Sequence, residues 1–219
     1  DKLIKIMNQF IFSREPCCSY LEVVPFGYET HISDLVRRLL RFIRTPTSKY
    51  IKYAPDYFVI DKRCPDKVYL LEFKATRTPL YSEYRINNIR KNAGDPTICW
   101  SNIGRMEELA YENYVSLGKL NIRVVILNYC AYYERPLLCD NVDSFKIIHR
   151  DSLKFRQGEG SGTPWVNFDT RSVMTFLDFI CQEHGFSKVD IEHLVTEAID
   201  ELNRQLPVRH HKNSPIKND

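Results

Sequence analysis

The order of hydrophobic and polar positions predicts a chain that mixes helices with strands. Residues 30–44 carry apolar side chains at the spacing of an amphipathic helix, and Pro46 ends that pattern. Residues 57–61 and 67–75 are short β-rich runs joined by a turn-like stretch, which indicates an antiparallel hairpin. The β-branched run within 121–133 is typical of a strand buried on both faces.

The rest of the chain is predicted to be mainly helical. Further helices are expected at 3–12, 79–92, 101–117, 170–184 and 188–205, with one more short strand at 145–149. Gly94-Asp95-Pro96 breaks the chain between two of these helices, and Ser187 with Asp190 resembles a capping arrangement for the last one.

A glycine-rich stretch at 157–164 is the best candidate for a linker. It divides the chain into a core at 1–156, a helical C-terminal appendage at 165–206 and a flexible tail at 207–219. The predicted fold class is therefore α/β, with a mixed central sheet flanked by helices and a helical appendage.

Composition limits the broad class of protein. With 219 residues, 43% hydrophobic and 27% charged, the chain can form a sizeable core and does not have the composition of a disordered protein. No apolar run is long enough for a membrane span, and no secretory signal is recognisable at the start. The seven scattered cysteines include no C-x-x-C pair, which favours free thiols and a reducing cytoplasmic location.

One acidic and basic set stands out around the hairpin. Asp56 precedes the first run, and Glu72-Phe73-Lys74, the one acidic-x-lysine sequence in the chain, lies late in the second. Hydrolysis of a phosphodiester uses a divalent cation to activate water, and hard cations prefer carboxylate oxygens. Glu72 and Lys74 are two residues apart, so the pleat of a strand directs both side chains to one face. Asp56 and Glu72 are the candidate ligands, and Lys74 is placed to assist the attacking water.

The hairpin register decides whether this set can assemble. A three-residue loop at 63–65 places Asp56 opposite Glu72, and a five-residue loop at 63–67 places it opposite Lys74. A loop of even length turns Asp56 to the face of Phe73, unless a bulge corrects the register. The hypothesis therefore requires an odd loop or a bulge.

Pro55-Asp56, fifteen intervening residues and Glu72-Phe73-Lys74 resemble the signature of the PD-(D/E)XK nuclease superfamily. The resemblance covers about residues 28–130 and implies a restriction-endonuclease-like core, Mg²⁺ bound by the acids and products with 5′-phosphates. Many members add an acidic residue near a preceding helix, a role that Glu29 matches. Some use Gln and Tyr in a following helix; Glu107 and Tyr111 have that spacing, with Glu in place of Gln.

The resemblance implies a Mg²⁺-dependent phosphodiesterase, with Mn²⁺ as a substitute and endonuclease action favoured over exonuclease action. Asp56, Glu72, Lys74 and Glu29 are the expected catalytic residues, and the three acids are the expected metal ligands. The partner is expected to be nucleic acid, DNA rather than RNA, with no membrane; a homodimer or larger nuclease complex stays open. The basic residues that follow the motif are expected to bind phosphates: Arg77, Arg85, Arg90 and Lys91.

Simpler interpretations remain for each feature. Asp56 could be only a carboxylate at the start of a strand. Glu72 and Lys74 could be an ion pair on a solvated face of the sheet. Glu29 could be only an acid in the first turn of a helix. Two other functions therefore stand beside the nuclease. One is a nuclease fold without catalysis that binds nucleic acid or supports an assembly, and the other is a protein-interaction domain in which the motif is coincidental.

Overall fold

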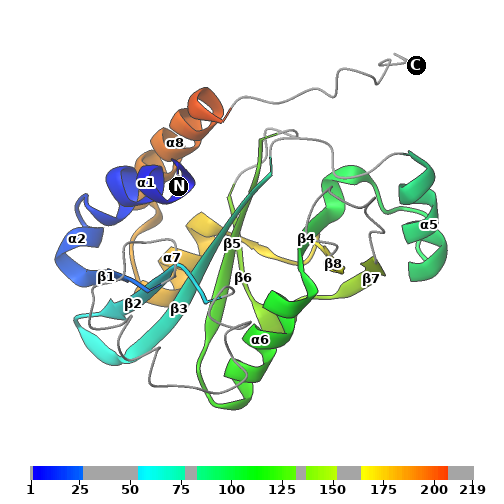
Figure 1. Ribbon diagram of the computed structural model, residues 1–219. Coiled ribbons are helices and arrows are strands. Elements are labelled where there is room, and N and C mark those ends of the chain that lie inside the picture. The colour runs from blue at the N-terminus through cyan, green and yellow to red at the C-terminus, as the bar shows by residue number, and fades with distance from the viewer. Residues whose placement is uncertain (1, 27–53, 77–82, 132–136, 152–163, 207–219) are drawn as a thin grey trace.

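The computed structural model describes residues 2–26, 54–76, 83–131, 137–151 and 164–206 (Figure 1). Its helices are α1 (Lys2–Met7), the π-helix η1 (Asn8–Phe12), α2 (Cys17–Tyr20), α5 (Glu83–Ala93), α6 (Glu108–Lys119), α7 (Phe176–His184), α8 (Lys188–Gln205) and the short 3₁₀ turns η2 (Trp100–Asn102) and η4 (Val142–Ser144). Its strands are β1 (Leu21–Pro25), β2 (Tyr57–Asp61), β3 (Cys64–Thr76), β4 (Ile103–Glu107), β5 (Val124–Cys130), β6 (Leu138–Asn141), β7 (Ile147–Asp151), β8 (Trp165–Asp169) and β9 (Met174–Thr175).

A mixed six-stranded sheet forms the centre of the molecule, with the order β1-β2-β3-β5-β6-β9. The predicted hairpin is confirmed, because β2 and β3 pair antiparallel. β5 then runs parallel to β3, while the remaining neighbours are antiparallel. β5 is buried almost throughout, as its β-branched run indicated. The predicted α/β class, with a mixed sheet flanked by helices, is confirmed.

A second, three-stranded antiparallel sheet has the order β4-β8-β7 and lies beside the first. The prediction of one helix at 101–117 is wrong in its first half, where η2 and β4 precede α6. No proline marks the change from β4 to α6, and the only glycine there, Gly104, lies inside the strand, so the apolar positions of the two elements read as one helical pattern. β7 confirms the strand predicted at 145–149, shifted by two residues toward the C-terminus.

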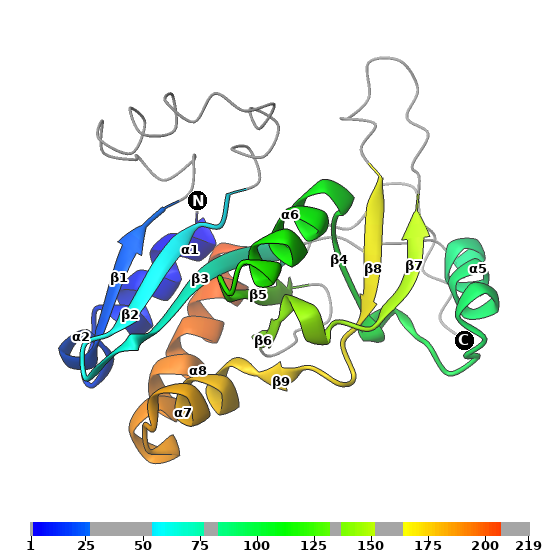
Figure 2. The ribbon, with the colours of Figure 1, turned by 90° about the horizontal axis from the view of Figure 1, so that it is seen from below.

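Helices cover both faces of the central sheet, as the view from below shows (Figure 2). On one face, α1, η1, α7 and α8 enclose the larger apolar cluster with the inward side chains of β2, β3 and β5, among them Val59, Leu71 and Leu127. On the other face, α6 and the second sheet enclose a separate cluster that includes Leu70 and Ile126. Neighbouring residues of β3 therefore face two different cores.

The C-terminal segment is built into the fold rather than appended to it. The prediction of a helical appendage at 165–206 missed two strands: β8 is the middle strand of the second sheet, and β9 pairs with β6 in the first. α7 and α8 share the apolar cluster of α1, through residues such as Phe176, Leu194 and Leu202. The core thus includes residues from both sides of the proposed linker.

Most other element predictions are confirmed within the described residues. The helix at 3–12 corresponds to α1 and η1, α8 has the predicted bounds, and α5 ends before Gly94, whose φ is +65°. Ser187 is the residue before α8, but its side chain makes no capping hydrogen bond. The predicted helix at 30–44, the glycine-rich stretch up to residue 163 and the tail at 207–219 lie outside the described residues.

Candidate functional site

The register of the β2–β3 hairpin places Asp56 opposite Glu72. Tyr57 pairs with Leu71, so the residue before β2 comes opposite the residue after Leu71. The turn itself has two residues, Lys62 and Arg63, because Asp61 pairs with Cys64.

A bulge next to this turn restores the register that an even loop would lose. Ile60 pairs with Val68 while Asp61 pairs with Cys64, so residues 65–67 lie between the two partners on β3. The structure therefore has neither of the odd loops considered from the sequence, of three or five residues. The register that places Asp56 opposite Glu72 is nevertheless obtained, because the bulge provides it.

Glu72 and Lys74 form the centre of the candidate site. Both point from β3 toward the α6 face, and the Lys74 Nζ lies 2.5 Å from the Glu72 Oε1. Glu72 is 4% exposed, while the Lys74 side chain keeps 35% of its surface. Leu71 and Phe73 point to the opposite face and are buried in the larger core, as predicted. The two polar side chains are therefore fixed on a platform that the core holds from behind.

Asp56 is tied to the same strand through its side chain. The Phe73 amide donates to the Asp56 Oδ2 at 2.8 Å, and the Asp56 carbonyl accepts from the Phe26 amide at 2.8 Å. The carboxylate of Asp56 therefore lies beside the backbone that connects Glu72 with Lys74. The three residues that the sequence singled out, Asp56, Glu72 and Lys74, come together at one end of the β2–β3 hairpin.

The junction of β4 with α6 and the helix itself add a third acid and a buried phenol. Tyr114 is 1% exposed, and its hydroxyl donates a hydrogen bond to the Glu72 carboxylate. Glu107 immediately precedes α6 and lies within electrostatic range of both Lys74 and Tyr114. Sequence reasoning had singled out Tyr111 of this helix. Tyr114 lies three residues after Tyr111, so both can share one face of α6, and the sequence alone does not tell which of them contacts Glu72.

The surrounding charges set the protonation of two of these groups. Burial disfavours the ammonium of Lys74, but the carboxylates of Glu72, Asp56 and Glu107 outweigh it and raise the Lys74 pKa. Burial, with the charge of Glu72 and the hydrogen bond to it, raises the Tyr114 pKa well above its usual value. At neutral pH, Lys74 is therefore a cation and Tyr114 a proton donor.

The carboxylate oxygens of Asp56 and Glu72 are the donor type that Mg²⁺ selects, and such sites often use only one or two carboxylates with water completing the shell. Among the described residues, no group of three or more His, Cys, Asp or Glu side chains is arranged to hold a metal ion. Glu29, the predicted third ligand, lies outside the described residues. The donor set thus fits a hard cation with two protein carboxylates.

Three of the predicted phosphate-binding residues, Arg85, Arg90 and Lys91, lie on α5 and not beside Glu72 and Lys74. α5 lies at the outer side of the second sheet, beside β7, in both views (Figures 1 and 2). On it, Arg85 pairs with Asp151 at 2.5 Å, and the Arg90 Nε donates to the Ile98 carbonyl at 2.7 Å. Lys91 is exposed on the same helix. Arg77 lies outside the described residues.

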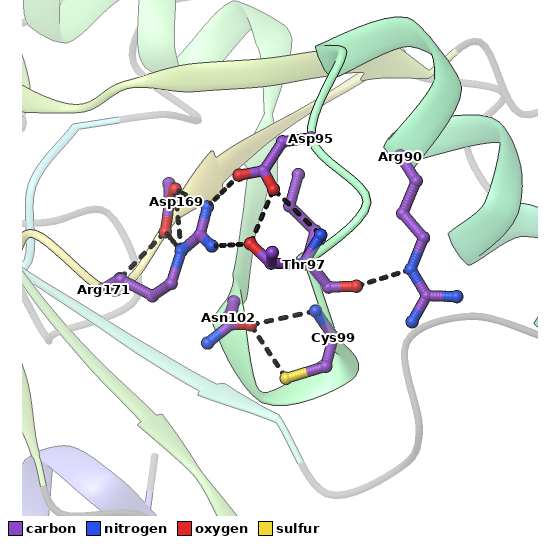
Figure 3. Close-up of polar contacts among 8 residues, drawn as sticks. Arg90, Asp95, Thr97, Cys99, Asn102, Asp169 and Arg171 are labelled. Carbon is purple, nitrogen blue, oxygen red and sulfur yellow. Dashed lines mark hydrogen bonds and ion pairs between the residues drawn. The ribbon is translucent and has the colours of Figure 1, made fainter.

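The segment after α5 is fixed by a polar cluster centred on Arg171 (Figure 3). The Arg171 guanidinium pairs with Asp95 and Asp169, each at 2.6 Å, and donates to the Thr97 hydroxyl at 2.8 Å. The Arg90 contact to the Ile98 carbonyl belongs to the same segment. Arg90 and Arg171 therefore connect α5, the segment that follows it and the end of β8, which is a structural role.

A second buried polar network lies at the far end of the hairpin. Asp61 accepts two hydrogen bonds from the Arg63 guanidinium, and the Nδ1 of His184 lies 2.9 Å from Asp61. The Nε2 of His184 is 3.0 Å from the Tyr69 hydroxyl. His184 and Tyr69 are each 3% exposed, so this arrangement connects α7 to the sheet and is closed to a substrate.

Two further observations concern the described chain as a whole. None of its helices combines the length and the apolar character needed to cross a membrane. The cysteines are all free, and burial raises the Cys17 pKa to about 12.

Comparison with protein-family models, with curated proteins and with solved structures gave no match.

Proposed function

We propose that this protein is a metal-dependent nuclease of the PD-(D/E)XK type, which hydrolyses phosphodiester bonds of DNA. One observation carries the proposal. The hairpin register, through its bulge, brings Asp56 opposite Glu72, with Lys74 on the same face. The mixed sheet flanked by helices is consistent with a restriction-endonuclease-like core.

Asp56 and Glu72 are the residues that would hold Mg²⁺ or Mn²⁺. The ion would lower the pKa of a water molecule and offset the charge of the phosphate. Lys74, charged at neutral pH, suits electrostatic stabilisation of the charge that develops in the transition state better than proton abstraction. Phe73 keeps Asp56 in place through its amide, since that hydrogen bond joins the two strands at the site.

A second function is favoured by the state of Glu72. Its carboxylate is nearly enclosed and already bonded to Lys74 and Tyr114, as expected for a structural ion pair. In that case the protein would be a nuclease-fold subunit that binds nucleic acid or supports an assembly without cutting it. A cation at Glu72 has to compete with Lys74, so cleavage and metal binding separate the two functions.

The direct test incubates the protein with supercoiled plasmid, linear duplex, single-stranded DNA and RNA, with Mg²⁺, Mn²⁺ or EDTA. The wild type should cut DNA only with a metal ion, and Lys74→Ala should lower the rate by at least about 100-fold. Lys119→Ala removes an exposed lysine from α6 and should leave the rate unchanged. The absence of cleavage by the wild type on every substrate would favour the non-catalytic subunit.

A further inference from the structure

The phenol of Tyr114 approaches the candidate site from the interior of the molecule. Tyr114 belongs to α6 and is buried in the apolar cluster between that helix and the central sheet, together with Leu70 and Ile126. Leu70 precedes Glu72 by two residues on β3, and Ile126 is the partner of Glu72 on β5. The hydroxyl thus reaches Glu72 through an apolar layer formed by the neighbours of Glu72 itself.

Glu72 is held from two directions. Lys74 approaches its Oε1 from the same strand, at 2.5 Å, and the Tyr114 hydroxyl donates from the helix. A lysine side chain has four rotatable bonds, whereas a buried tyrosine has two and is fixed by the packing around its ring. If a cation replaces Lys74 beside Glu72, Tyr114 remains to fix the orientation of the carboxylate.

We propose that Tyr114 is the positioning residue of this site: its hydroxyl holds Glu72 in the orientation in which the carboxylate binds the metal ion. This inference rests on the proposed nuclease function and adds a residue that the sequence resemblance did not indicate. That resemblance pointed to Tyr111 on the same helix. Tyr111 lies four residues after Glu107 and is half-buried, whereas Tyr114 is seven residues after Glu107 and enclosed.

The chemistry of metal sites supports such a role. Groups that hydrogen-bond a ligating side chain fix its orientation, and their removal commonly costs about 10- to 100-fold in metal affinity or activity. Tyr114 is suited to this because a phenol carries its proton at neutral pH and donates it to a carboxylate, and because its buried ring is fixed by packing. It does not touch the substrate, so it should affect turnover and metal binding, and not the affinity for DNA.

The experiment compares Tyr114→Phe with Tyr20→Phe, each of which removes one hydroxyl and keeps the ring. Tyr20 lies on α2, where its ring contacts Arg63 at the hairpin turn. Mn²⁺ binding is measured by electron paramagnetic resonance, and cleavage of a DNA oligonucleotide gives kcat and KM. Tyr114→Phe should weaken Mn²⁺ binding and lower kcat, each about 10- to 100-fold, with KM for DNA unchanged. Tyr20→Phe should match the wild type in all three quantities.

The outcomes separate this inference from the function on which it rests. If the wild type binds Mn²⁺ through Asp56 and cuts DNA, but Tyr114→Phe does both equally well, the positioning role is overturned and the nuclease stands. An equal loss in Tyr20→Phe also overturns it, because the effect is then not specific to the hydroxyl beside Glu72. If the wild type shows no Mn²⁺ site that Asp56→Asn removes, the metal-dependent function falls and the positioning role falls with it.

Discussion

At the scale of single residues, the site is defined by an excess of negative charge over positive charge. One ammonium, that of Lys74, lies among the carboxylates of Glu72, Asp56 and Glu107. The excess of negative charge is what a divalent cation would balance, and it also explains why Lys74 keeps its proton. The sequence predicted the first three of these residues from their spacing. It could not predict Glu107 and Tyr114 as neighbours, because that contact depends on how α6 packs.

Lys74 should remain charged throughout the neutral range in the metal-free protein. Its pKa is raised, although burial opposes this, because the neighbouring carboxylates favour the cation. Carbon-13 NMR of the lysine Cε resonances should therefore show Lys74 with a pKa above the usual value of a lysine. Glu72→Gln should lower the Lys74 pKa. A Lys74 resonance that titrates near pH 7 in the wild type would contradict the assignment of an electrostatic role.

His184 should make the stability of the protein depend on pH. Burial disfavours its charged form and lowers its pKa below the usual 6.5, an effect that Asp61 only partly offsets. The unfolded chain therefore binds more protons below pH 6.5, so the free energy of unfolding should be at its plateau above 6.5 and fall as the pH decreases toward the pKa of the folded state. The Asp61 pKa is lowered, mainly by hydrogen bonds from Arg63, so its own contribution is lost only below its usual 3.8.

Urea unfolding between pH 7 and pH 5 measures this effect. His184→Gln should flatten the slope, while His193→Gln, which changes an exposed histidine of α8, should leave it unchanged. At pH 7, His184→Gln should also cost about 1–3 kcal/mol, since it disturbs buried hydrogen bonds to Asp61 and Tyr69. Equal slopes in the wild type and both variants would show that His184 titrates normally.

At the scale of elements, the hairpin bulge shows the limits of prediction from sequence. Both strands followed from their composition, and the face of Glu72 and Lys74 followed from their spacing. The length of the turn stayed open, because a two-residue turn with a bulge gives the same register as a three-residue loop. β4 was missed because nothing in the sequence marks its junction with α6. Its pairing with β8 is a long-range contact that local periodicity does not encode.

Gly104 allows β4 to approach the ring of Phe168. A Cβ at this position would lie 2.2 Å from the Cε2 and Cζ of that ring, which is itself stacked on Phe145. Gly104→Ala should therefore lower the free energy of unfolding by about 1–3 kcal/mol, because the aromatic pair has to shift.

Gly118→Ala is the matched control for this change. On α6, the added methyl meets only the end of the Asp143 side chain, so stability should change by less than about 1 kcal/mol. Denaturant unfolding monitored by circular dichroism measures both variants. Equal stability of Gly104→Ala and the wild type would show that β4 does not approach Phe168 as described.

At the scale of the whole molecule, both sheets depend on the C-terminal segment. A linker-like composition suggested a boundary after residue 156, yet β8 and β9 pair with strands from the earlier part, and α8 buries Leu194, Ala198 and Leu202 in the shared core. A glycine-rich composition indicates that a stretch can act as a linker. It does not indicate whether the segments on its two sides pack against each other.

Deletion of residues 165–219 should therefore abolish cooperative folding. The buried side chains lost from α7 and α8 would each contribute about 2–5 kcal/mol, and their sum exceeds the usual total stability of a domain. Thermal melting followed by circular dichroism measures this. A truncated chain that still melts in one sharp transition would support an independent core at 1–156.

The central claim, a cation held between Asp56 and Glu72, can be measured in the intact protein by nitrogen-15 NMR with substoichiometric Mn²⁺. The account predicts selective broadening of the amide signals of Asp56, Glu72 and Phe73, while that of Arg63 at the hairpin turn stays sharp. Asp56→Asn should remove the effect. Broadening that is absent at these amides, or that persists unchanged in Asp56→Asn, would contradict the account.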